Sequence, residues 1–201
     1  MKSSTIYSND FNRLLDATKA FVKKNENVRK HFCFIKLEFS SEKQEVTAIA
    51  VDGYRMSVEH AVISNCDEDF VAYIKPTIRL PQREYATISL MDDGKIAQVE
   101  CNGFLFGYEQ PNQNDFDWRS ALPQGAPIYE IAFNGNLLLS AIQAAKVSAG
   151  NSFKTPLVLQ FFSPMSPVLI RTNTHDIKMV LPVRYRRKEE GDTVEEGESK
   201  C

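Results

Sequence analysis

The stretch VDGYRMSVEHAVIS, residues 51–64, carries the clearest structural signal in this sequence. Its Asp52-Gly53 pair stands between two strand-like runs, Glu45–Val51 and Tyr54–Val62. Asp-Gly between two such runs predicts a two-residue hairpin turn, because both turn positions require a positive φ that these residues tolerate. The stretch is therefore predicted to be a β-hairpin.

The same turn chemistry recurs further along the chain. Asp93-Gly94 separates the runs Ala86–Met91 and Lys95–Cys101, and Asn102-Gly103 precedes Phe104–Glu109. His31–Phe39 and Phe70–Ile74 also have the composition of strands. Together these segments predict an antiparallel meander.

Two helices are predicted from apolar residues spaced at i, i+3, i+4 and i+7. The first follows a cap supplied by Ser8, Asn9 or Asp10, and its apolar stripe is Phe11, Leu14, Leu15, Thr18, Phe21 and Val22. The second follows Asn134, and its stripe is Leu138, Ala141, Ile142 and Ala145.

An order of strand, helix and three strands occurs twice. It begins at Thr5–Ser8 and again at Ile128–Phe133, where the later strands are Leu157–Phe162, Val168–Thr172 and Ile177–Tyr185. A third copy starts at Phe70–Ile74, but Lys75–Pro81 holds two prolines where its helix belongs, so that helix is predicted to be lost or cut to a turn. The sequence thus predicts an internal βαβββ repeat and an α+β fold.

Composition argues against several functional classes. No apolar run approaches the ~20 residues of a membrane span, and the first residues do not resemble a signal peptide, so a cytoplasmic protein is expected. The sequence has no CxxC spacing, no clustered histidines and no Ser/His/Asp set, Walker loop, GxGxxG or HExxH. We therefore expect no metal, no cofactor and no enzymatic activity.

Two segments lie outside the predicted elements. Residues 110–125 have loop composition around Phe116 and Trp118, and we expect this linker to be tied down because an exposed aromatic pair would forgo apolar burial. Residues 188–201 hold six acidic residues and two lysines with almost no apolar residues, which predicts a disordered acidic tail.

The hairpin at residues 51–64, taken together with LPVRY at residues 181–185, resembles the bacterial DNA polymerase III β subunit, the sliding clamp. That family carries a TDGHRLA-type hairpin in its middle domain and ends on MPMR-like residues. Phe11–Leu37, Phe70–Lys75 and Phe104–Pro123 resemble further parts of the middle domain. Ile131–Arg184, which includes FNGNLLLSAIQA, resembles the last half of the third domain.

This resemblance implies a reduced sliding clamp built from βαβββ repeats, with antiparallel sheets and helices on one face. Residues 1–124 would form a domain like the clamp's middle domain, with its second helix reduced. Residues 125–187 would form half of a domain, like the end of the third domain. The family's first domain and the first half of its third domain have no counterpart here.

In clamps, polymerases and repair proteins dock a short peptide motif in an apolar pocket between the middle domain and the end of the chain. Carried over residue by residue, the pocket wall here would be Phe32, Val51, Gly53, Tyr54, Arg55, Met56, Trp118, Arg119, Ala121, Met179, Leu181, Pro182, Val183 and Arg184. The family's linker residues are replaced near Asp117 and Ser120, so the preferred peptide can differ. The alternative for Met179, Leu181 and Val183 is that they are plain strand residues that fill the core.

The resemblance also implies non-specific contact with double-stranded DNA through basic residues on helices. The candidates are Arg13, Lys19, Lys23, Lys24, Arg29 and Lys146, and the alternative is an ordinary solvated surface. The implied function is a processivity or scaffold protein of DNA replication or repair. A clamp mimic that competes for partners without encircling DNA, and an enzyme with an unrecognised site, remain alternatives.

The half domain at residues 127–187 would expose a helix stripe and a sheet edge that need a cover. Either it folds back on the first part of its own chain or it pairs with a second copy. We expect a homo-oligomer.

Overall fold

The computed structural model describes residues 1–23, 30–111, 117–150, 156–172 and 175–185. The chain forms two compact units, Met1–Leu122 (unit 1) and Pro123–Cys201 (unit 2), which are considered separately. The predicted acidic tail, residues 188–201, lies outside the described residues. The part of the chain that is described contains no helix long and apolar enough to cross a membrane.

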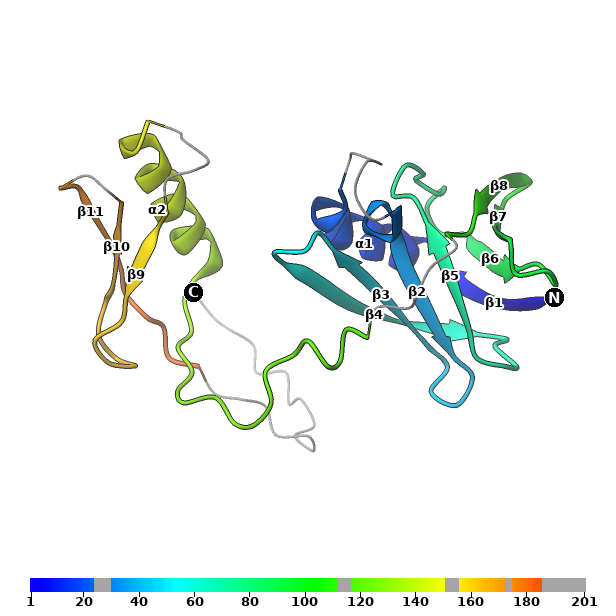
Figure 1. Cartoon of the computed structure of the whole chain (residues 1–201), viewed down its shortest axis with the longest axis horizontal. Helices are drawn as coiled ribbons and strands as arrows, with labels where there is room; N and C mark the ends of the chain where they lie inside the picture. Colours follow the sequence, from blue (N-terminus) through cyan, green and yellow to red (C-terminus); the bar gives the residue numbers. More distant parts are fainter. Residues whose placement is uncertain (24–29, 112–116, 151–155, 173–174, 186–201) are drawn as a thin grey trace, which may run out of the picture. The chain divides into compact units, whose positions relative to one another are not determined.

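Unit 1 is one antiparallel sheet of eight strands with a helix against it (Figure 1). The strand order across the sheet is β5-β2-β3-β4-β1-β6-β7-β8. Along the chain the elements are β1 (Lys2–Tyr7), α1 (Ser8–Thr18), β2 (Ile35–Ser40), β3 (Glu45–Val51), β4 (Met56–Ser64), β5 (Phe70–Ile74), β6 (Tyr85–Leu90), β7 (Ile96–Cys101) and β8 (Phe104–Glu109), with 3-10 turns at Lys19–Phe21 and Lys30–Cys33.

Helix α1 buries the predicted stripe as far as Thr18, whereas Phe21 and Val22 lie beyond the end of the helix and pack half-buried against the core. Phe11, Leu14 and Leu15 join a core with the inward side chains of the sheet, and Thr18 is also buried. The predicted side-chain cap is wrong: the helix begins at Ser8 and its N-cap, Tyr7, makes no capping hydrogen bond. The Ser8 hydroxyl instead accepts a hydrogen bond from the Glu84 backbone N–H, because Ser8 faces the loop before β6.

The turn predictions had mixed outcomes. Asn102 and Gly103 both have positive φ and join β7 directly to β8, which confirms the two-residue turn. The two-residue turn at Asp52-Gly53 is wrong, because Val51 pairs with Met56 and the loop spans residues 52–55. The Asp52 N–H donates to the Arg55 carbonyl across this longer loop.

Unit 1 contains two related halves, β1-α1-β2-β3-β4 and β5-β6-β7-β8. Residues 75–84, which connect β5 to β6, form turns and no helix, which confirms that the middle helix is lost. Leu80 from this loop is only 2% exposed and fills the core in its place. The Asn12 side chain of α1 donates to the Leu80 carbonyl and accepts from the Leu80 N–H, both at 2.9 Å.

Unit 2 has helix α2 (Gly135–Ser148) packed on a three-stranded antiparallel sheet (Figure 1). The sheet order is β11-β10-β9, from β9 (Val158–Gln160), β10 (Val168–Arg171) and β11 (Ile177–Val180). Asn134 caps α2 as predicted, since its side chain accepts from the N–H groups of Asn136 and Leu137. The buried core is Ala145, Val168, Ile170 and Val180, and Leu138, Ala141 and Ile142 of the predicted stripe pack against it.

The strand predicted at Ile128–Phe133 is wrong. The segment makes one isolated bridge, between Ala132 and Val183, and Ile128 is 98% exposed. A ladder needs a partner along its length, and in the described part of unit 2 this segment meets a strand-like neighbour at Val183 alone.

Candidate functional site

The loop between β3 and β4 presents an exposed tyrosine on a firmly held backbone. The Asp52 carboxylate accepts hydrogen bonds from the backbone N–H groups of Tyr54 and Arg55, at 3.0 and 3.1 Å. Gly53 has a φ of +90°, and a Cβ built there would lie 3.7 Å from the Phe32 ring. The Tyr54 side chain is 95% exposed at the tip of this loop.

Arg55 is fixed on three sides. Its Nε donates to Asp52 Oδ2 at 2.9 Å, its Nη2 donates to the Ala20 carbonyl at 2.6 Å, and its guanidinium lies 4.9 Å from the centre of the Phe21 ring. The hydrogen bond from Arg55 is the main cause that lowers the pKa of Asp52 below its ordinary value. The carboxylate therefore stays charged at neutral pH and keeps the arginine in place.

Lys23 lies over two aromatic rings rather than on an open basic face. Its Nζ is 5.3 Å from the Phe32 ring centre and 5.9 Å from that of Tyr54, which are cation–π distances. Its backbone N–H donates to the Phe32 carbonyl at 2.8 Å. We call Phe21, Lys23, Phe32, Tyr54 and Arg55 the aromatic cluster. Four residues predicted for the pocket (Phe32, Gly53, Tyr54 and Arg55) thus come together, and Val51 and Met56 pair at the base of their loop.

Trp118 and Arg119 are both attached to Glu38 of β2. The indole N–H and Arg119 Nη1 donate to Glu38 Oε2 at 3.2 and 3.0 Å, while Lys36 Nζ lies 2.7 Å from Oε1. Trp118 is only 9% exposed, which agrees with the predicted tied-down linker; Phe116 lies outside the described residues. Ala121 is exposed in the turn that follows. Trp118 therefore serves the structure of unit 1, and little of it is accessible to a ligand.

The end of the described chain in unit 2 is largely exposed. Met179 and Leu181 are 60% and 64% exposed, Val183 and Arg184 are also exposed, and Pro182 is half-buried. The interpretation of Met179, Leu181 and Val183 as core residues is therefore wrong. In β11 the buried side chain is the alternate one, Val180.

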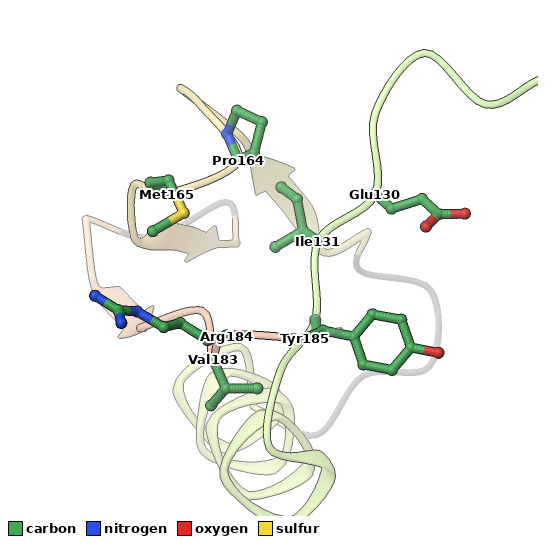
Figure 2. Close-up of a pocket in the computed structure, with 8 residues that line it drawn as sticks. Glu130, Ile131, Pro164, Met165, Val183, Arg184 and Tyr185 are labelled. Carbon is green, nitrogen blue, oxygen red and sulfur yellow. The ribbon is translucent and has the colours of Figure 1, made fainter. Parts of the chain in front are cut away.

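An open hollow of about 960 Å³ lies beside this segment in unit 2. In Figure 2 Ile131 and Met165 lie to one side of the extended segment at residues 130–132, while Glu130 and Tyr185 extend the other way. The lining residues are Glu130, Ile131, Ala132, Pro164, Met165, Val183, Arg184 and Tyr185. Of these lining residues, the sequence predicts only Val183 and Arg184 as site residues. The others come together because the turn at residues 163–166 lies beside residues 130–132, and a local sequence pattern does not predict that contact.

The basic residues predicted to contact DNA have varied surroundings. Arg13 donates to Glu59 at 3.3 Å and to the His60 carbonyl at 2.6 Å, and Lys19 lies 2.5 Å from Asp16. Lys146 lies in the last turn of α2. Lys24 and Arg29 are outside the described residues. Among the residues that are described, no group of three His, Cys, Asp or Glu side chains could hold a metal ion.

Comparisons with known proteins relate the chain to one fold. No protein-family model matches its sequence, and no curated protein matches it. Its structure resembles the DNA polymerase III β subunit of Pseudomonas aeruginosa with a TM-score of 0.74 and 14% identity, over 90% of this chain and 51% of that one. The β subunit of Streptococcus pyogenes matches with a TM-score of 0.73 and 14% identity, over 90% of this chain and 50% of that one. The sliding clamp of Bacillus subtilis matches with a TM-score of 0.65 and 18% identity, over 92% of this chain and 64% of that one.

The predicted fold class is therefore confirmed, since the antiparallel sheets with their two helices match these structures. The chain spans about half the length of the β subunits first matched. Over that length, this protein has the sliding-clamp fold of the DNA polymerase III β subunits.

Proposed function

We propose that this protein is a clamp-type binding protein of DNA replication or repair, which holds partner peptides in an apolar pocket and catalyses no reaction. Its fold supports the proposal, since the similar structures are DNA polymerase subunits and sliding clamps. The observation that carries it is Tyr54, a 95% exposed aromatic side chain on a loop held by Asp52 and Gly53. Rigid, exposed aromatic residues are typical anchors of binding surfaces.

Each unit has its own candidate wall for peptide contact. The wall on unit 1 is the loop that carries Tyr54, with Arg55 at its rim. The wall on unit 2 is the exposed segment with Met179 and Leu181, with Arg184 at its rim. Adaptable apolar side chains flanked by cations suit an extended peptide with apolar anchors and an acidic or polar flank.

Isothermal titration calorimetry with a QLxLF-type clamp-binding peptide tests this proposal. We expect micromolar affinity, about −8 kcal/mol. Leu181→Asp should abolish binding because it puts a charge into an apolar wall, and Tyr54→Ala should weaken binding at least about tenfold through loss of an anchor. Val62→Asp, at a residue that is 78% exposed on β4, is the matched control and should bind normally. A wild-type chain without saturable heat would contradict the proposal.

A clamp mimic that binds partners without holding DNA is a second candidate. The observation that favours it is the pairing of Arg13 with Glu59 and of Lys19 with Asp16, which reduces the positive charge that α1 offers to phosphates. Retention on closed circular DNA in low salt separates the two functions. A processivity clamp stays on closed circles and leaves linearised ones, whereas a mimic is retained on neither.

A further inference from the structure

In unit 1, two related halves are joined into one sheet by strand pairing between them. Its first half is β1 to β4 and its second half is β5 to β8. The first strand of the first half, β1, pairs with β6 over its whole length, from Lys2 with Leu90 to Tyr7 with Tyr85. The first strand of the second half, β5, pairs with β2 from Ile35 with Ile74 to Phe39 with Phe70. Each half therefore gives its first strand to the second strand of the other.

Unit 2 corresponds to one such half. Ala132 lies three residues before α2 and bridges to Val183, as Thr5 lies three residues before α1 and pairs with Ser64. Val183 is then equivalent to Ser64, so Val180, three residues earlier, is equivalent to Ala61. Their strand partners, Val168 and Val46, are equivalent in turn, and all four residues are buried. On this equivalence residues 128–133 correspond to β1 and strand β9 corresponds to β2.

In unit 1 the strands β1 and β2 join the two halves. Their equivalents in unit 2, residues 128–133 and β9, have no strand partner at the corresponding edges within the described part of unit 2. Strand β9 pairs with β10 only, and residues 128–133 form one β-bridge, to Val183, while the ring centre of Tyr129 lies 6.5 Å from that of Phe161. Both edges carry exposed apolar side chains, with Ile128 at 98% and Phe162 at 68%. Tyr129, Val158, Leu159 and Phe161 are also exposed there. Open strand edges with apolar side chains promote pairing with another chain.

We propose that unit 2 of a second copy of this chain completes unit 2, by reciprocal pairing of residues 128–133 of each copy with β9 of the other. The exchange of first strands in unit 1 is reciprocal, so two identical halves can make it through one two-fold axis that closes the assembly. Unit 1 is not the occupant, because both of its junctions are already made internally. At its β5 edge, moreover, the Gln110 side chain bonds to both backbone groups of Tyr73.

The junctions of unit 1 also predict the register. Ser4 pairs with Ile88 at one junction and Ala72 pairs with Leu37 at the other, and all four side chains are buried. Ile131 takes the place of Ser4, and Leu159 takes the place of Leu37. Ile131 then lies opposite Leu159 of the partner subunit, and by antiparallel count Ile128 lies opposite Phe162 of the partner subunit.

This interface goes beyond the proposed function, and none of its residues belongs to the proposed peptide pocket. Ile128→Lys should therefore leave peptide binding unchanged, and Leu181→Asp should leave the dimer unchanged. A failure of one proposal is thereby distinguishable from a failure of the other.

The test is the solution mass of the full chain by light scattering at about 50 µM, a concentration that saturates a micromolar dimer. Wild type should have twice the 22.8 kDa mass of one chain. Ile128→Lys and Phe162→Glu should each be monomeric, because each puts a charge opposite an apolar side chain at both junctions. Both side chains are exposed in the single chain, so neither change should unfold it. Val62→Lys on unit 1 is the control and should remain dimeric.

The two monomeric variants should dimerise when they are mixed. In the mixed pair the new lysine faces the new glutamate at one junction, while Ile128 faces Phe162 at the other, as in wild type. A mixture with the mass of a dimer supports the reciprocal register. A monomeric wild type, or a dimer that survives Ile128→Lys, overturns the proposal.

Discussion

Glu38 is the residue that joins the end of unit 1 to its sheet. It accepts hydrogen bonds from Trp118 and Arg119 and lies within 2.7 Å of Lys36. Burial works to raise the pKa of Glu38, but the hydrogen bonds from Lys36, Trp118 and Arg119 and the charge of Lys36 outweigh it, so the pKa lies below its ordinary value. The charged form of Glu38 is therefore the one that the fold stabilises.

The lowered pKa predicts an acid-induced loosening of the linker. A carboxylate whose pKa is lower in the folded state stabilises the fold above its ordinary pKa of 4.5, and this contribution is lost as the pH falls through the folded-state pKa. Trp118 is the only tryptophan of the chain, so its fluorescence should change in a step below pH 4.5. Glu38→Gln should remove the step and Glu59→Gln should keep it. The same step in Glu38→Gln would contradict the assignment.

At the scale of elements, the loop at residues 75–84 takes the place of a helix. Its prolines do not suit a helix interior, and its backbone groups need other partners inside the core. The side chain of Asn12 supplies them for Leu80, as donor to the carbonyl and acceptor from the N–H. The loop is thereby attached to α1 at a buried point.

Asn12→Ala should destabilise the protein by about 2–3 kcal/mol, because it leaves a buried N–H and a buried carbonyl without partners. Urea unfolding followed by circular dichroism measures the change. Asn9→Ala removes a comparable contact at the surface, to the Arg83 N–H at 3.2 Å, and should cost less than about 1 kcal/mol. Equal losses for the two variants would contradict the role of Asn12 as an anchor.

At the scale of the whole molecule, the two units differ in how complete they are. Unit 1 has a core shared by all its strands and α1, whereas the described core of unit 2 is Ala145, Val168, Ile170 and Val180 with a few half-buried neighbours. A core this small contributes little stability by itself. The proposed second copy would add apolar burial to unit 2 alone.

Hydrogen exchange should therefore depend on protein concentration in unit 2 and not in unit 1. Amides of β10 should exchange faster at 0.5 µM than at 50 µM, by up to about tenfold, because the monomer fraction of a dimer rises at most with the square root of the dilution. Amides of β3 should exchange equally at both concentrations. Uniform protection of β10 at the two concentrations would show that unit 2 is stable without a partner.

The sequence determined the parts of this protein that depend on short segments. The stripe with Phe11 and Leu14, the turn at Asn102-Gly103 and the missing helix before Leu80 each follow from periodicity or turn chemistry within a few residues. The resemblance to the sliding clamps predicted more than these local features. Several short motifs occur in the same order along the chain as in that family, and this order predicted the overall fold.

Only the tertiary structure decided which distant groups meet. It placed Lys23 over the rings of Phe32 and Tyr54, attached Trp118 to Glu38, and left residues 128–133 with a single bridge. Local patterns could not predict these outcomes. A strand pattern states that a segment can pair, whereas the presence of a partner depends on residues far away in the chain or, for unit 2, on the second chain that we propose.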